Sequence, residues 1–178
     1  MQTYIALFRG INVGGKHLLP MKQLVSMLES LGLTEVKTYI QSGNAVFKCR
    51  EQDSRQLAKT IGSAVSQQFG FKPEIMLLTL DDLQRVIRAN PFPEAESEPS
   101  SLHVGFLASV PANPNLQALA KLADNGERFA QVDQAFYLHA PAGIARSKLA
   151  AGAEKQLGVA VTSRNWRSAC KILEIAQA

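Results

Sequence analysis

The hydrophobic and polar positions of the chain follow two patterns that alternate in a regular order. Short apolar runs of strand length begin with residues 3–8 (TYIALF). Between such runs lie stretches whose apolar residues recur every three or four positions, which is typical of amphipathic helices. The first of these follows Pro20, a favourable first helical residue, and ends before Gly32, a favourable helix terminator. The pattern therefore predicts strands and helices in alternation.

In the first half of the chain this pattern predicts four strands and three helices. The strands are residues 3–8, 36–40, 45–48 and 74–78, and the helices are residues 20–31, 54–69 and 79–90. Gln41-Ser42-Gly43-Asn44 separates the second and third strands, and its Gly and Asn tolerate a positive φ. We therefore expect a β-hairpin there.

The same order returns in the second half. The predicted strands are residues 102–108, 128–133, 136–140 and 159–161, and the predicted helices are residues 114–123, 145–157 and 163–176, with Asn113 and Ser163 capping the first and last. We expect an α+β protein built from duplicated ferredoxin-like βαββαβ units, each followed by an extra helix. The first half would span 1–90, an acidic Pro-rich linker 91–101, and the second half 102–178.

Composition agrees with a folded globular chain. Of the 178 residues, 46% are hydrophobic and 19% charged, which argues against a disordered, collagenous or coiled-coil protein. No apolar run approaches the ~20 residues that cross a bilayer, and the start of the chain lacks the pattern of a signal peptide. Cys49 and Cys170 form no CxxC pair. We expect a cytoplasmic protein with reduced thiols and no membrane partner.

The formal net charge of +4 is unevenly distributed. Residues 1–28 hold three bases and no acid, residues 141–178 hold six bases and two acids, and residues 51–100 hold eight acids and five bases. If the fold brings the two ends together, they form one positive face for an anionic partner. The alternative is that this charge is solvated and only keeps the protein soluble.

Three segments carry a resemblance to a known family. They are YIALFRGINVGGK (residues 4–16), TYIQSGN (residues 38–44) and TSRNW (residues 162–166). Together they resemble the bacterial family catalogued as domain of unknown function 1697 (DUF1697). The resemblance implies two ferredoxin-like halves, in agreement with the element order, and it implies no established activity. Ser163 stands where the family more often has a second Thr.

The loop after the first strand is the first candidate site, since loops between a strand and a helix often carry ligand contacts. Its glycines would let backbone amides approach a ligand, and its polar side chains could bind an anion. It has neither Walker A nor GxGxxG spacing, and a structural turn or lid is the alternative interpretation. The candidate residues are Arg9, Gly10, Asn12, Gly14, Gly15 and Lys16.

The segment 162–167 supports anion binding in a second way. If Ser163 begins the last helix, Arg164 and Arg167 lie near the positive end of its dipole, where cations are unfavourable unless an anion answers them. Glutamates of the protein itself are the alternative partners. Asn165 in this segment, and Gln41, Ser42 and Asn44 in the hairpin, complete the candidate set, although the hairpin residues also make a well-formed turn.

The remaining chemistry is limited. His17, His103 and His139 lie far apart in the sequence, so we expect no metal site, and no motif requires a cofactor. The leading hypothesis is a binding protein for a phosphorylated metabolite or nucleotide. The alternatives are a nucleic-acid-binding module, an enzyme of unknown reaction with no identifiable base, and an interaction protein whose motifs only lock its halves together. The sequence specifies no oligomeric state.

Overall fold

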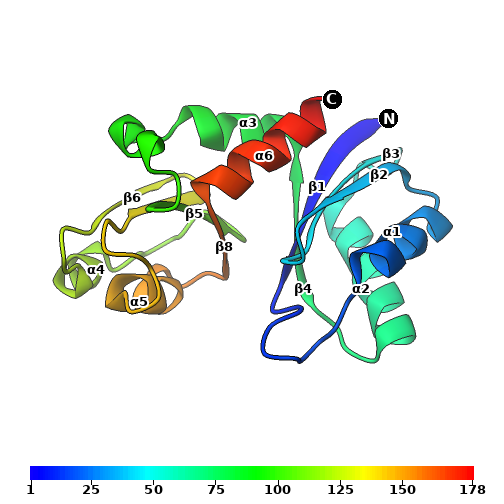
Figure 1. Ribbon diagram of the computed structural model, residues 1–178, viewed down its shortest axis with the longest axis horizontal. Coiled ribbons are helices and arrows are strands. Elements are labelled where there is room, and N and C mark those ends of the chain that lie inside the picture. The colour runs from blue at the N-terminus through cyan, green and yellow to red at the C-terminus, as the bar shows by residue number, and fades with distance from the viewer. The chain divides into compact units, whose positions relative to one another are not determined.

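The computed structural model describes residues 1–178, and its elements follow the predicted order (Figure 1). The strands and helices of the first half are β1 (Gln2–Arg9), α1 (Met21–Ser30), β2 (Thr34–Tyr39), β3 (Asn44–Cys49), α2 (Ser54–Phe69), β4 (Glu74–Thr79) and α3 (Leu80–Arg88). A 3-10 helix, η1 (Pro93–Ser97), follows. The second half contains β5 (Leu102–Leu107), α4 (Leu116–Leu122), β6 (Arg128–Val132), β7 (Ala135–His139), α5 (Lys148–Leu157), β8 (Val161–Asn165) and α6 (Trp166–Gln177).

Each half forms one four-stranded sheet. The strand orders are β2-β3-β1-β4 and β6-β7-β5-β8, and every neighbouring pair is antiparallel. This is the order in which a βαββαβ unit places its first and third strands at the centre of the sheet. The expected α+β fold with duplicated ferredoxin-like units is therefore confirmed.

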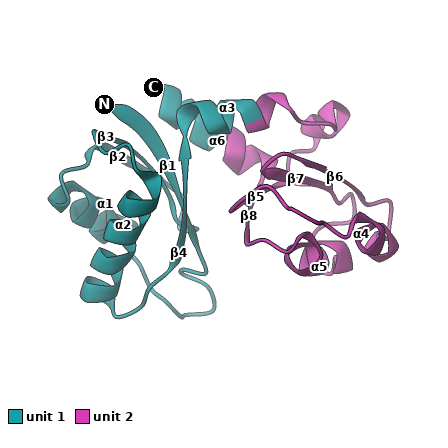
Figure 2. Ribbon diagram, turned by 180° about the vertical axis from the view of Figure 1, so that it is seen from behind, with its two compact units in different colours: residues 1–85, 171–178 teal, residues 86–170 magenta.

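The chain divides into two compact units that we call unit 1 and unit 2 (Figure 2). Unit 1 contains residues 1–85 and 171–178, and unit 2 contains residues 86–170. The division falls inside α3, after Arg85, and inside α6, after Cys170. The last residues of the chain thus belong to the unit that its first residues form. The acidic segment 91–101 holds η1 and belongs to unit 2.

Alternation along the strands builds the core of unit 1. Tyr4, Ala6 and Phe8 of β1 point to one face and pack with α1 and α2. Ile5 and Leu7 point to the other face and are also buried. Residues 80–85 and 171–178 lie on that second side of the sheet (Figure 2). In unit 2, residues of β5 and β7 pack with α4 and α5 in the same way.

Local side-chain bonds explain several of the helix boundaries. Asp53 accepts from the amides of Arg55 and Gln56 at 3.0 and 3.1 Å and begins α2, which Gly70 ends at a φ of 78°. At the start of α3, Thr79 and Asp82 bond reciprocally: the Thr79 amide donates to Asp82 Oδ2 at 3.0 Å, and the Asp82 amide donates to Thr79 Oγ1 at 3.1 Å. Thr79 therefore caps α3.

The start of the last helix was predicted wrongly. Residues 161–165 are the strand β8, not the strand 159–161 followed by a helix from Ser163. β5 pairs with this segment as far as His103 opposite Asn165, and the pairing holds its backbone extended. Asn165, rather than Ser163, caps α6, because its Oδ1 accepts from the Ser168 amide at 2.8 Å.

Two other helices also begin later than predicted. Asn115, not Asn113, caps α4 by accepting from the Ala118 amide at 3.0 Å. Pro114 disfavours a helical conformation at Asn113, the residue before it. Ser147 caps α5 by accepting from the Ala150 amide at 3.0 Å, so this helix begins at Lys148 rather than Ala145.

No helix in the structure is both long enough and apolar enough to span a membrane.

Candidate functional site

The loop between β1 and α1 carries Lys16 on a tight turn at its tip. Val13 and Lys16 form an isolated antiparallel bridge, and the Lys16 amide donates to the Val13 carbonyl at 3.1 Å. Gly14 and Gly15, between them, have φ values of 59° and 71°. Two consecutive left-handed residues are required by this type of turn, and glycine adopts them without steric cost. The sequence Val-Gly-Gly-Lys thereby exposes Lys16 at the tip of the loop.

Asn12 holds this loop closed. Its Nδ2 donates to the Leu19 carbonyl at 3.0 Å and to the Gln41 carbonyl at 2.8 Å, and its Oδ1 accepts from the Leu19 amide at 2.7 Å. The Asn12 amide donates to the His17 carbonyl at 3.1 Å, at a φ of 54°. Both side-chain donors of Asn12 thus bind the backbone of unit 1 itself. Asn12 positions the loop and joins it to the hairpin between β2 and β3.

The hairpin is built around a buried glycine and a buried asparagine. The Gly43 carbonyl accepts from the Phe8 amide at 2.8 Å, which ties the hairpin to β1. Asn44 is buried, and its Nδ2 donates to the Tyr39 carbonyl and to Ser42 Oγ, both at 3.0 Å. Asn44 lies in β3, and the positive φ values belong to Ile40 and Gly43, so the turn begins one residue earlier than predicted. Gln41 and Ser42 are exposed beside the loop.

His17 belongs to the same loop and is held by contacts that its sequence does not indicate. Its ring stacks on Phe71 with 4.6 Å between the ring centroids, and its Nδ1 lies 3.1 Å from the Gly10 carbonyl oxygen. Because a carbonyl oxygen only accepts, Nδ1 carries the proton and the neutral ring keeps its lone pair on Nε2. The apolar partner, far away in the sequence, left no local signal for this arrangement.

The two cations of the first segment differ in their surroundings. Arg9, at the end of β1, forms an ion pair with Glu74 of β4 at 3.1 Å, because the antiparallel register places these residues opposite one another. Lys16 is exposed, and no carboxylate of the chain lies within ion-pair distance. Lys16 therefore keeps its charge available to an external anion, whereas part of the charge of Arg9 is neutralised within unit 1.

The third motif lies in unit 2. Arg164 stands opposite Val104 in the β5–β8 pair, and its Nη1 donates to the Ser163 carbonyl at 2.9 Å. Burial lowers the pKa of Arg164 to about 10, so the guanidinium stays charged at neutral pH. Ser163 and Arg167 are exposed. Since the segment is a strand, Arg164 does not lie in a helical turn, and only Arg167 lies near a helix N-terminus.

The structure thus brings two of the three segments into contact. Asn12 joins the loop 9–16 to the hairpin at Gln41, within unit 1. The segment 162–165 belongs to unit 2, and its union with the loop in one site stays a prediction.

No group of three His, Cys, Asp or Glu side chains is arranged to hold a metal ion. Both cysteines are free, and burial raises the pKa of the Cys170 thiol.

Comparison with known families agrees with the motifs. The model of the family described as "Protein of unknown function (DUF1697)" matches residues 1–137. The chain belongs to the DUF1697 family. The matched part includes the loop and the hairpin of unit 1 and ends before the segment 162–166. No curated protein matches the chain.

A solved structure of similar fold covers the whole of this DUF1697 protein. The conserved bacterial protein SP0830 from Streptococcus pneumoniae is 22% identical to it, with a TM-score of 0.74, and the match covers 98% of each chain. At this identity the likeness shows the fold alone. Both four-stranded units of the DUF1697 protein thus have a counterpart of known structure.

Proposed function

We propose that this DUF1697 protein binds an anionic ligand, a phosphorylated metabolite or a nucleotide, at the tip of the unit 1 loop formed by Gly14, Gly15 and Lys16. The observation that carries the proposal is the exposed, unpaired Lys16 ammonium on a turn that the rest of the loop holds in place. The amides of Gly14 and Gly15 donate to no acceptor of the chain. Two backbone donors and one cation therefore lie within three consecutive residues.

The local geometry favours close approach of a ligand to the backbone. A Cβ placed on Gly14 or Gly15 would meet no atom within 4 Å, so the space beside each glycine is open. The three side-chain hydrogen bonds of Asn12 fix the base of the loop before any ligand arrives. A site that is held in its binding conformation loses less conformational entropy on binding than a flexible one.

The segment 162–167 forms the second part of the proposal. Arg164 is a half-buried cation and Arg167 an exposed one, so each could donate a charge-assisted hydrogen bond to an anion. Lys16 and its glycines act within unit 1, and the two arginines act within unit 2.

A small anion is favoured over single-stranded RNA bound on the unit 1 sheet. RNA-recognition modules stack bases on aromatic side chains of an open sheet face. In unit 1 the face opposite α1 and α2 carries Ile5, Leu7 and Val46, which are aliphatic and buried, and one aromatic residue, Tyr39 of the edge strand β2. A single aromatic residue at the edge of the sheet does not form a platform for two or three stacked bases, whereas the loop at the end of the sheet is open.

The test compares two lysines of the same unit. Adenosine monophosphate and inorganic pyrophosphate are titrated into the protein at constant ionic strength, and amide chemical shifts are followed by NMR. Lys16→Ala should weaken binding about tenfold, as the loss of one charge-assisted contact predicts. Lys22→Ala, an exposed lysine in α1 with the same charge, should leave the affinity within about twofold. An equal loss of affinity in both variants, or no change in the amide chemical shifts of Gly14 and Gly15, would contradict the proposal.

A further inference from the structure

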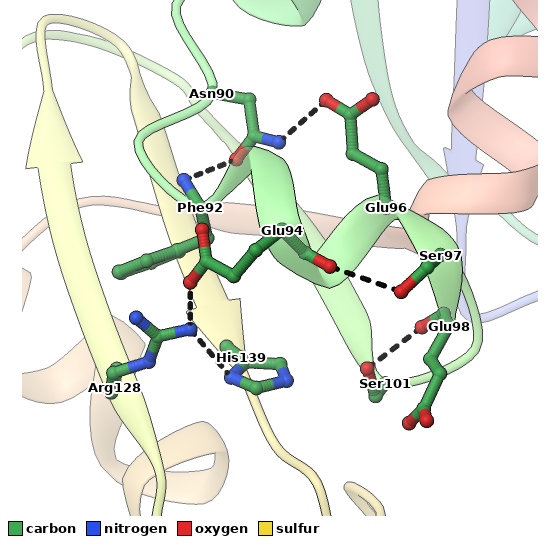
Figure 3. Close-up of polar contacts among 9 residues, drawn as sticks. All are labelled: Asn90, Phe92, Glu94, Glu96, Ser97, Glu98, Ser101, Arg128 and His139. Carbon is green, nitrogen blue, oxygen red and sulfur yellow. Dashed lines mark hydrogen bonds and ion pairs between the residues drawn. The ribbon is translucent and has the colours of Figure 1, made fainter.

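Arg128 lies in unit 2, outside the three family motifs, and its side chain is held in place by its neighbours. Arg128 of β6 stands directly opposite His139 of β7, so the two side chains share one face of the sheet. Their strand neighbours Phe129 and Leu138 point the other way, into the core with α4 and α5. Arg128 and His139 therefore lie on the face opposite the helices, where residues of the acidic segment 91–101 contact them (Figure 3).

Three neighbours fix the guanidinium of Arg128. Its Cζ lies 4.6 Å from the centroid of the Phe92 ring, which supports it by a cation–π contact. Its Nη2 donates to His139 Nδ1 at 3.1 Å and also to a carboxylate oxygen of Glu94 (Figure 3). Phe92 is itself held by Asn90, whose Oδ1 accepts from the Phe92 amide at 3.0 Å. Arg128 is thus positioned on the sheet before any external ligand is present.

Donors exceed acceptors around Arg128. A guanidinium carries five N–H groups, and only the two of Nη2 have acceptors in the chain. The groups on Nη1 and Nε have none, and the side chain is 46% exposed. His139 accepts through Nδ1, so its neutral ring carries the proton on Nε2 and adds no negative charge. Glu94 is the one carboxylate that binds this guanidinium.

Glu94 occupies the place that an external oxyanion would take. It binds Nη2, the nitrogen that takes part in both of the two-pronged edges with which a guanidinium binds phosphate. The Arg128 hydrogen bond lowers the pKa of the Glu94 carboxyl, so Glu94 is ionised at neutral pH. The Glu94 side chain is 58% exposed, and such surface ion pairs contribute little, so a better ligand can replace it.

We propose that Arg128, supported by Phe92 and His139, is a phosphate-binding site of unit 2, and that Glu94 of the acidic segment is its intramolecular competitor. The ligand group is a phosphate monoester or diester, bound by both prongs of the guanidinium while Glu94 swings away. The proposal stands independently of the loop in unit 1, since it shares no residue with Lys16 or its turn.

The experiment follows the Nε–Hε signal of Arg128 by NMR while inorganic phosphate or dimethyl phosphate is added at constant ionic strength. Arg128→Lys identifies the signal by its absence and keeps the charge. Glu94→Gln removes the competitor, and Glu98→Gln removes the same charge from the same segment without a contact to Arg128. Thermal unfolding of each variant checks that the fold is retained.

We expect phosphate to shift the Arg128 signal, and Glu94→Gln to tighten the dissociation constant about two- to fivefold, which corresponds to the loss of one surface ion pair. Glu98→Gln should change it less, and Lys16→Ala should leave the Arg128 signal responsive, which separates this site from the loop. Preference for inorganic phosphate indicates a monoester ligand, and preference for dimethyl phosphate a diester. Equal effects of Glu94→Gln and Glu98→Gln, or no shift of Arg128 in Glu94→Gln, overturn the proposal.

Discussion

Gly43 and Gly14, two glycines of the DUF1697 motifs, serve different purposes, although both have a positive φ. Gly43, at 82°, packs against β1: a Cβ there would lie 2.7 Å from Ile11 Cδ1 and 2.7 Å from Phe8 Cβ. Gly14, at 59°, has open space around it. Gly43 is thus required by packing and by backbone conformation, and Gly14 by conformation alone.

Substitution of these glycines by alanine should separate the two causes. Gly14→Ala should lower the free energy of unfolding by about 1 kcal/mol, the cost of a left-handed residue with a Cβ. Gly43→Ala should cost about 2–4 kcal/mol, because overpacking adds to that strain. Urea unfolding measures both. If the two variants lose the same stability, the close contact of Gly43 with Phe8 and Ile11 does not exist in solution.

His103 gives stability a pH dependence of known sign. Burial lowers the pKa of His103 below 6.5, while a hydrogen bond to the Ser100 backbone partly opposes this, and its Nε2 is buried without a partner. An unfolded histidine titrates near pH 6.5. As the pH falls below that value, the unfolded state binds the proton first, and stability falls until the folded His103 is protonated as well.

The free energy of unfolding should therefore decrease more steeply below pH 6.5 in the wild type than in His103→Leu, which cannot titrate there. Urea unfolding between pH 7.5 and about 5 in the same buffer series gives the two slopes. Other groups contribute equally to both proteins, so the difference reports His103. Parallel slopes would show that the folded protein accepts the proton on His103 without cost.

At the scale of elements, the boundary between β8 and α6 has a testable cause. Asn165 ends the pairing with β5 and caps the helix through the Ser168 amide, while Ser163 lies in the strand. Asn165→Ala should lower stability by about 1 kcal/mol, the usual cost of a lost N-cap. Ser163→Ala should change it by less than about 0.5 kcal/mol. A larger loss in Ser163→Ala would restore Ser163 as the cap and contradict the extended strand.

At the scale of the whole molecule, the last turns of α6 belong to the unit formed by the first residues of the chain. Ile172 is 2% exposed and lies in unit 1. Ile172→Ala should lower stability by about 2–4 kcal/mol, as truncation of a fully buried side chain does. Hydrogen exchange should show amides within residues 1–85 losing protection first. Ala176→Gly, near the chain end, is the control. Uniform loss of protection in both units would argue against this assignment.

How much could be predicted from the sequence varies with the range of the interaction. The order of strands and helices follows from patterns that repeat within a few residues, and this order by itself predicts the ferredoxin-like topology. The capping contact between Thr79 and Asp82 and the glycine that ends α2 are equally local, because they depend on residues at most four apart. The DUF1697 motifs were equally visible.

Contacts between distant residues could not be predicted in this way. The sequence placed Asn12 among ligand-binding candidates, but its donors reach Leu19 and Gln41 and hold the loop. The stacking of His17 on Phe71, and the pairing of β8 with β5 that moved the start of α6, join segments more than fifty residues apart. A local sequence pattern does not identify such a partner, because many distant residues have side chains of the same chemistry and the pattern does not select one of them.

The sequence by itself therefore determined the element order, the fold class, the family and the position of a lysine directly after two glycines. Only the tertiary structure decided which polar groups are used internally and which are left to a ligand. The physical reason is that secondary structure depends on backbone preference and periodicity, whereas availability for binding depends on hydrogen-bond partners supplied by distant strands. Arg128 and Glu94 illustrate this: both are ordinary charges in the sequence, and the unit 2 sheet makes one the partner of the other.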